Sequence, residues 1–289
     1  MTILSLLLVL GAVQIWGSGA PLHRDAWFYS LLESLRNLSG LRGELVFFAA
    51  LIIPLAGLGI ALALAAKILP VLGVLIINVL VLLYSLGRGD FSRAVNQYIG
   101  AAERQDSTQA SLVVDELAFE PQPCNTDTWS ELHLEALQAV VYRGFERLFA
   151  VFFWFLVLGA PGALLYRLSV LYRENLEEGA HDQVLVNKCL WALEWPAVRL
   201  LGLSWALAGN FVSCYEQWRE CLFCALRGSA TVLEHYVQGA LNLRPEDLLE
   251  KDEACHSRAS AEQIRAVQSL LSRTLWLWLC VIAIVSLLL

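Results

Sequence analysis

Five charged side chains have the chemical types and the positions to form a small binding site. They are Arg104, Asp106, Arg143, Glu146 and Arg199. The first two lie in a long polar region, the next two directly precede an uncharged run, and the last lies inside a weaker apolar segment. Three arginines and two carboxylates leave net positive charge. In a partly desolvated site, these charges attract an anion far more strongly than they would in bulk water. We therefore predict one pocket for a phosphate, a nucleotide or a small carboxylate.

Each of these residues also has a structural alternative. Arg143 and Arg147 directly precede an apolar run, where basic residues usually anchor a membrane span. Asp106 could simply cap the helix that follows it. Glu194 and Arg199 could form an ion pair, because a charge inside a membrane is costly unless it is paired or faces water. The sequence leaves these alternatives open beside the binding site.

Other patterns that carry chemistry are weak or missing. Cys221 and Cys224 form a lone CxxC on an apolar helix, which packing explains better than zinc or redox chemistry. The five histidines lack metal-ligand spacing, and we find no glycine-rich phosphate loop and no GxSxG. The seven cysteines are scattered and odd in number, which fits reduced thiols better than a disulfide framework. We therefore predict no metal site and assign no catalytic residue.

The composition is that of a membrane protein. Of the 289 residues, 57% are hydrophobic and only 16% are charged, whereas a soluble domain has about 25% charged residues. The formal net charge of -7 argues against a nucleic-acid partner, which would need a basic face. We expect an all-α polytopic membrane protein with five to six transmembrane helices, whose first partner is the lipid bilayer.

The positions of the apolar runs predict where this single integral membrane domain crosses the bilayer. The expected spans cover about residues 2–16, 45–66, 68–84, 148–166, 190–209 and 272–289. The polar regions 85–147 and 210–271 have helical patterns, apart from a helix break at 121–127 and an acidic flexible linker at 244–260. Asp90 is expected to cap the helix that begins at Phe91. Lys67 and Pro70 mark a tight turn, so the second and third spans should form a helical hairpin. The first run is slightly short, which leaves open whether it crosses. In the central span, Pro161 should kink the helix, and Gly159 should seat a neighbouring helix.

The distribution of basic residues predicts the orientation. With six crossings, the regions 17–44, 85–147 and 210–273 share one side of the membrane and carry 15 of the 20 Lys and Arg residues. The positive-inside rule places that side in the cytoplasm. Both large helical loops and the predicted pocket would then face the cytoplasm.

Four stretches of the chain resemble the AmpE family. They are YSLGRGDFSRA at 84–94, RQDS at 104–107, FERLFAVFFWFLVLGAPGALLYRL at 145–168 and EWPAVRL at 194–200. AmpE proteins are inner-membrane proteins of Gram-negative bacteria associated with induction of chromosomal β-lactamase. The resemblance implies a multi-pass inner-membrane protein that modulates β-lactamase induction and cell-wall recycling signalling. It would bind a small anionic ligand, such as a muropeptide, or a cytosolic protein partner at its cytoplasmic face.

The AmpE family is in turn similar to the CobD/CbiB family of membrane enzymes, which form an amide bond using ATP. Asp106 matches the aspartate of that family's Gly-Arg-Asp-Thr motif, Glu146 stands where the family has an aspartate, and Arg199 matches an arginine. Gln105 replaces the motif's arginine, and Lys188 replaces an aspartate further on. An ATP- and magnesium-dependent amide-forming enzyme acting on a small substrate is therefore the alternative function, and the sequence leaves open whether the protein is an enzyme.

Overall fold

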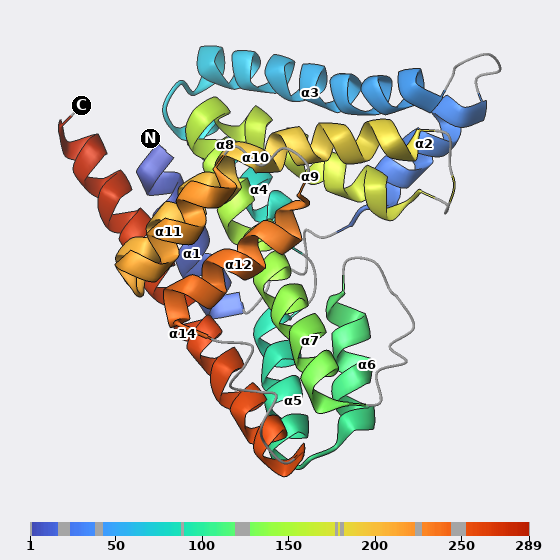
Figure 1. Ribbon diagram of the computed structural model, residues 1–289. Coiled ribbons are helices and arrows are strands. Elements are labelled where there is room, and N and C mark those ends of the chain that lie inside the picture. The colour runs from blue at the N-terminus through green and yellow to red at the C-terminus, as the bar shows by residue number, and fades with distance from the viewer. Residues whose placement is uncertain are drawn as a thin grey trace. The chain divides into compact units, whose positions relative to one another are not determined.

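The computed structural model shows a protein built from helices. It describes residues 2–16, 24–37, 43–87, 90–118, 128–176, 179, 182–222, 227–243 and 253–288. These residues form helices joined by turns and contain no strand (Figure 1), which confirms the all-α class. The predicted helix break at 121–127, the linker residues 244–252 and Cys224 lie outside the described residues.

The chain divides into two compact units. The first comprises Met1–Gly89 with Ala150–Glu194, and the second comprises Asp90–Phe149 with Trp195–Leu289. The helix α10 (Gln183–Ala208) contributes its N-terminal part to the first unit and its C-terminal part to the second. The second unit contains both polar regions in which the sequence predicts helices. That the whole chain forms a single integral membrane domain stays a prediction.

The first unit is built around a helical hairpin. Its other helices are α1 (Thr2–Trp16), α2 (Ala26–Asn37), α8 (Ala150–Leu158) and α9 (Ala160–Glu174). The hairpin pairs α3 (Gly43–Ile68) with α4 (Leu72–Ser85) across a turn that contains Pro70, as the sequence predicts. α4 also packs against α1 and α9, and α3 packs against α2 and α9. In this core the rings of Phe47 and Tyr172 meet edge to face at 5.0 Å, a favourable geometry for aromatic pairs.

The expected span 148–166 is not one continuous helix. α8 ends at Leu158, and α9 begins at Ala160 with Pro161 in its first turn. Gly159 between them has φ +70° and ψ -155°, a conformation that glycine adopts readily and other residues do not. Proline suits a first helical turn because its missing N–H would have no helical partner there. The predicted kink is therefore wrong, since the glycine and the proline end one helix and start another.

The close helix contact in this region also differs from the prediction. Among the described residues, a Cβ added to Gly159 would meet only Pro161 Cδ, at 3.9 Å, so no described helix is seated there. A Cβ added to Gly162 would instead collide with the carbonyl oxygen of Trp154 and would lie 2.7 Å from the Leu158 Cβ. Gly162 is therefore the residue that allows α9 to pass close to α8.

Replacing Gly162 with alanine should destabilise the protein, because the colliding atom is backbone and cannot move aside cheaply. Overpacking of this kind costs about 1–3 kcal/mol, and each kcal/mol lowers the melting temperature by about 2–4 °C in a protein of this size. Thermal unfolding of the purified protein in detergent measures the shift. Gly57→Ala is the matched control, because a Cβ there meets nothing within 4 Å. Equal melting temperatures for the two variants would contradict this account of the break.

The second unit joins both polar regions into one helical assembly. Its further helices are α5 (Phe91–Glu103), α6 (Ser107–Leu117), α7 (Trp129–Gly144), the π-helical turn η2 (Phe145–Phe149), α11 (Phe211–Cys221), α12 (Ser229–Leu241) and α14 (Glu253–Leu288). α14 packs along α5 and α7, and α7 also contacts α6 and α12 (Figure 1). α11 packs against α12. The helical character predicted for both polar regions is confirmed in their described parts.

The C-terminal helix begins earlier than the sequence predicts. We expected a flexible linker to residue 260, but α14 runs unbroken for 36 residues from Glu253. Ser257, Ser260 and Ala261 are buried within the unit, and their small side chains let α14 approach its neighbours closely. The linker prediction is therefore wrong from Glu253 onward, because small and charged residues resemble a loop in composition even where they pack as a helix. The expected span 272–289 is the C-terminal half of this helix.

Two helices of the described chain are long and apolar enough to cross a membrane. They are α3 and the segment Cys255–Val285 of α14. α4 is apolar but shorter. The expected total of five to six spans therefore stays a prediction.

Candidate functional site

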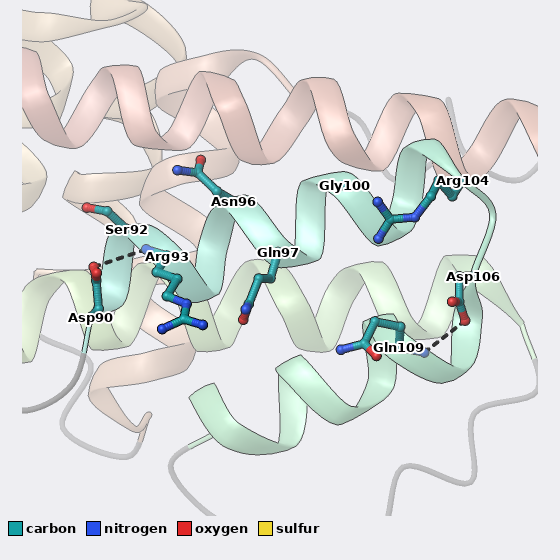
Figure 2. Close-up of a pocket in the computed structure, with 9 residues that line it drawn as sticks. All are labelled: Asp90, Ser92, Arg93, Asn96, Gln97, Gly100, Arg104, Asp106 and Gln109. Atoms are coloured by element: carbon teal, nitrogen blue, oxygen red, sulfur yellow. Dashed lines mark hydrogen bonds between the residues drawn. The ribbon is translucent and has the colours of Figure 1, made fainter.

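A polar groove of about 750 Å³ lies along α5 and the start of α6 (Figure 2). It is lined by Asp90, Ser92, Arg93, Asn96, Gln97, Gly100, Arg104, Asp106 and Gln109. Two predicted site residues, Arg104 and Asp106, belong to this lining. The two arginines donate hydrogen bonds only, the two aspartates accept them, and the three carboxamides can do both. The groove therefore offers cationic donors for an anionic group and carboxamides for hydroxyl or amide groups, while its two aspartates balance the charge of its two arginines.

One face of α5 supplies most of this lining. Arg93, Gln97, Gly100 and Arg104 recur at intervals of three or four residues, which places them on one side of a helix. Figure 2 shows the Arg104 side chain reaching back along α5 toward Gly100, and a Cβ on that glycine would lie 3.6 Å from Nη1. Arg93 and the three carboxamides were not predicted, although this spacing was the signal for Arg93 and Gln97.

The RQDS turn between α5 and α6 is a helix stop followed directly by a helix start. Gln105 has φ +60°, and its N–H donates to the carbonyl of Ala102 at 3.1 Å, while the N–H of Asp106 donates to the carbonyl of Ala101 at 3.0 Å. These two bonds are the Schellman arrangement that ends many helices. Asp106 Oδ1 then accepts a hydrogen bond from the Gln109 N–H at 3.0 Å. The capping role considered for Asp106 is confirmed.

Arg143 and Glu146 form an ion pair where α7 continues into η2. Arg143 Nη1 lies 3.1 Å from Glu146 Oε2, and the Glu146 side chain is only 2% exposed. The same guanidinium donates from Nε to the carbonyl of Leu117 at 2.9 Å and from Nη2 to the carbonyl of Ala118 at 3.2 Å. Those carbonyls end α6, where acceptors lack helical partners and the helix dipole is negative. Arg143 therefore ties the end of α6 to α7.

Arg199 likewise donates hydrogen bonds to the carbonyls that end a helix, in this case α11. Its Nη2 and Nε donate to the carbonyls of Cys221 and Leu222 at the end of α11, at 3.1 and 3.4 Å. Its guanidinium also lies 4.9 Å from the centre of the Trp195 ring, within the range of a cation–π contact. Arg199 is buried. Arg143 and Arg199 thus each stabilise the C-terminal end of a helix.

The structure places the five predicted residues in three groups. Arg104 and Asp106 share the groove, Arg143 and Glu146 share the ion pair, and Arg199 lies at the end of α11. A single pocket that all five residues share stays a prediction. The ion pair between Glu194 and Arg199 also stays a prediction.

A buried hydrogen-bond chain in the second unit was not predicted. His133 of α7 bonds through Nδ1 to Ser260 Oγ at 2.8 Å and through Nε2 to Gln263 Oε1 at 2.6 Å. The Tyr98 hydroxyl of α5 bonds to the same serine at 2.8 Å. Burial lowers the pKa of His133 to about 4, although the Gln263 bond opposes this shift. Burial likewise raises the pKa of Tyr98 to about 12, so both side chains are neutral near pH 7.

Of the two cysteines in the lone CxxC, the structure describes Cys221, and this residue is packed in the interior. Cys221 is buried, and the Arg227 guanidinium donates to its sulfur at 3.6 Å. In the part of the chain that the structure describes, no three His, Cys, Asp or Glu side chains are grouped as a metal ion would require. The arrangement of the described residues gives no support to a zinc site here.

These features define an all-α protein with apolar helices of membrane length and a polar helical unit. The family described as "Regulatory signalling modulator protein AmpE" matches residues 1–267. The chain therefore belongs to the AmpE family, as its motifs indicate.

Two curated relatives match a shorter part of the chain. The cobalamin biosynthesis protein CobD of Chromobacterium violaceum is 33% identical over 87 residues, which are 29% of this chain and 28% of the relative. CobD of Stutzerimonas stutzeri is 32% identical over 92 residues, which are 29% of each chain. The chain thus spans less than a third of the length of these relatives. No solved structure matches it.

Proposed function

We propose that the protein is a regulatory protein of the bacterial inner membrane that modulates signalling in β-lactamase induction and cell-wall recycling. The observation that carries this proposal is the match to a family of regulatory signalling modulators over residues 1–267. The CobD relatives match less than a third of the chain, so they support an enzymatic function less strongly.

Exposed apolar side chains support the membrane location. On α3, Ile52, Ile60 and Ile68 are 60%, 63% and 75% exposed. Continuous apolar surfaces of this kind are rare on proteins that face water on all sides, and they fit contact with lipid chains. The basic residues in the polar regions favour a multi-pass topology with regions 85–147 and 210–271 in the cytoplasm.

The groove along α5 and α6 is the place where we propose that a small anionic ligand binds. Arg93 and Arg104 would contact its carboxylate or phosphate through charge-assisted hydrogen bonds. The carboxamides of Asn96, Gln97 and Gln109 would bind its hydroxyl or amide groups. A muropeptide carries all of these groups. In this proposal the ion pair and Arg199 do not touch the ligand but hold the helices around it.

The alternative is a CobD/CbiB-like amide-forming enzyme that uses ATP and magnesium. The local identity of 33% with a CobD protein is the observation in its favour. Magnesium is bound through carboxylates and substrate phosphates, and the described residues fit this poorly. Asp106 caps α6, and Glu146 is paired with Arg143. The regulatory function is therefore the better supported of the two.

Thermal unfolding of the purified protein with added ligands separates the two functions. A muropeptide at about 100 times its dissociation constant should stabilise the folded state by about 2.7 kcal/mol, whereas ATP with magnesium should have no effect. Arg104→Gln should abolish the shift, and Arg219→Gln, on the exposed surface of α11, should keep it. Stabilisation by magnesium and ATP alone would favour the enzyme, and no shift with either would contradict ligand binding in the groove.

A further inference from the structure

α11 presents an aromatic stripe, defined here as Phe211, Tyr215 and Trp218, on one side of the helix. Neighbouring rings in the stripe are stacked, with centroids 5.5 and 5.7 Å apart and interplanar angles of 9° and 21°. Phe211 and Tyr215 are 50% and 39% exposed, and Val212 beside them is 67% exposed. Leu207, at the end of α10, continues the apolar surface with 60% exposure. Such a cluster of exposed apolar side chains marks an interaction surface.

The buried surface of α11 next to the stripe holds the helix in this orientation. The thiol of Cys214 is buried and lies 3.6 and 3.5 Å from the carbonyls of Gly202 and Tyr236. Before the helix, the N–H of Asn210 donates to the carbonyl of Ala240 at 2.8 Å. Trp218 is partly buried, and its Nε1 donates to the carbonyl of Arg199 at 2.8 Å. α11 therefore cannot rotate without breaking these contacts, so Phe211 and Tyr215 stay exposed in the folded unit.

The apolar part of α14 is fixed to α10 seven residues before the stripe begins. Trp278 Nε1 donates to Ser204 Oγ at 2.8 Å, which fixes α14 to α10 shortly before α11 begins. On the same stretch of α14, Trp276 and Ile284 are 64% and 59% exposed, and this stretch belongs to a helix that is apolar enough to span a membrane. Tryptophan and tyrosine favour the boundary between lipid and water, since their rings are apolar and their edges polar.

We propose that α11 lies along the membrane surface, with its aromatic stripe inserted among the lipid headgroups. This inference rests on the proposed membrane location. Glu216 and Glu220 are exposed on the side of α11 away from the stripe, where they would face water. Arg219, beside the stripe, can extend its charge to the headgroups. A helix with one apolar face and one charged face is the usual form of such an interfacial element.

The stacking of the three rings also helps to decide which kind of ligand covers the stripe. A sugar ligand binds to the open face of an aromatic ring, but here each ring has at least one face turned toward a neighbouring ring. Lipid chains and headgroups need only exposed apolar area and ring edges, which the stripe provides. The bilayer is therefore the occupant that these contacts favour.

Depth-dependent fluorescence quenching in lipid nanodiscs tests this inference. A bimane label is attached through Val212→Cys on the stripe side, through Glu220→Cys on the charged side, or through Ile60→Cys on α3. All native cysteines except the buried Cys214 and Cys221 are replaced by serine. Nitroxide lipids that carry the quencher either near the headgroup or deep in the acyl chain report the depth of the label.

We expect the label at 212 to lose fluorescence to the shallow quencher more than to the deep one, and the label at 220 to lose little to either. The label at 60 should be quenched by lipid in any case. If 60 is quenched while 212 behaves like 220, a protein partner or water covers the stripe and the inference is overturned. If 60 is not quenched either, the membrane location itself fails.

Discussion

Replacing Arg143 with methionine should lower the free energy of unfolding by roughly 3–5 kcal/mol, the usual cost of removing the ion-pair partner of a buried charge. The substitution removes the cation that lies 3.1 Å from the buried Glu146 carboxylate. It also removes the donors to the carbonyls of Leu117 and Ala118 at the end of α6. Chemical unfolding of the purified protein in detergent, followed by circular dichroism, measures the loss.

Two further variants decide whether the ion pair is the cause. Arg143→Met combined with Glu146→Gln should recover a large part of the loss, because the neutral amide costs much less to bury than a carboxylate. Arg93→Met, on an exposed arginine of the groove, should change stability by less than about 0.5 kcal/mol. A single Arg143→Met variant as mild as Arg93→Met would contradict the structural role assigned to this arginine.

Lowering the pH from 6.5 to 4 should remove roughly 3 kcal/mol of stability through His133 alone, at 1.36 kcal/mol for each pKa unit. Burial lowers the pKa of this histidine from 6.5 to about 4 in the folded protein. The unfolded chain therefore takes up the proton first as the pH falls. Its contribution to stability is complete above pH 6.5 and is lost progressively as the pH approaches 4.

The comparison with His133→Gln isolates this effect from the titration of carboxylates. Glutamine cannot titrate, so the variant keeps every other source of acid sensitivity. The wild-type protein should be the more stable of the two at pH 7, and its advantage should shrink by roughly 3 kcal/mol as the pH falls to 4. Denaturant unfolding at several pH values measures both curves. An advantage that stays constant with pH would show that the pKa of His133 is the same in the folded and unfolded states, which would contradict this account.

Local patterns predicted much of the helical structure. Pro70 between two apolar runs indicated the hairpin of α3 and α4, and Asp90 was predicted to cap α5, as its bond to the Arg93 N–H at 3.1 Å confirms. In contrast, Gly159 was taken as part of a kinked helix, because its positive φ cannot be read from residue types. The N-terminal half of α14 was missed because its composition resembles a linker.

The tertiary partners of the candidate residues could not be predicted from spacing. Arg143 and Glu146 stand one helical turn apart, so their ion pair follows from their positions. The contacts of Arg143 with Leu117 and Ala118 depend on how α6 packs against α7, which no local pattern shows. The partners of His133 in α14 are 127 and 130 residues away in sequence. Only the packing of α7 against α14 brings them together.

The central proposal is that ligand binding in the α5–α6 groove modulates β-lactamase induction. Its most direct test is the induction curve of a bacterial strain whose chromosomal copy encodes Arg93→Gln with Arg104→Gln. Loss of charge-assisted hydrogen bonds worth about 1.5–3 kcal/mol each should shift the inducer concentration for half-maximal induction by about tenfold or more. The amount of protein in the membrane should not change, and the Arg219→Gln control should respond as wild type. If the double variant matches wild type while deletion of the chain shifts the curve, the groove is not the regulatory site. If deletion also leaves the curve unchanged, the proposed modulation itself is contradicted.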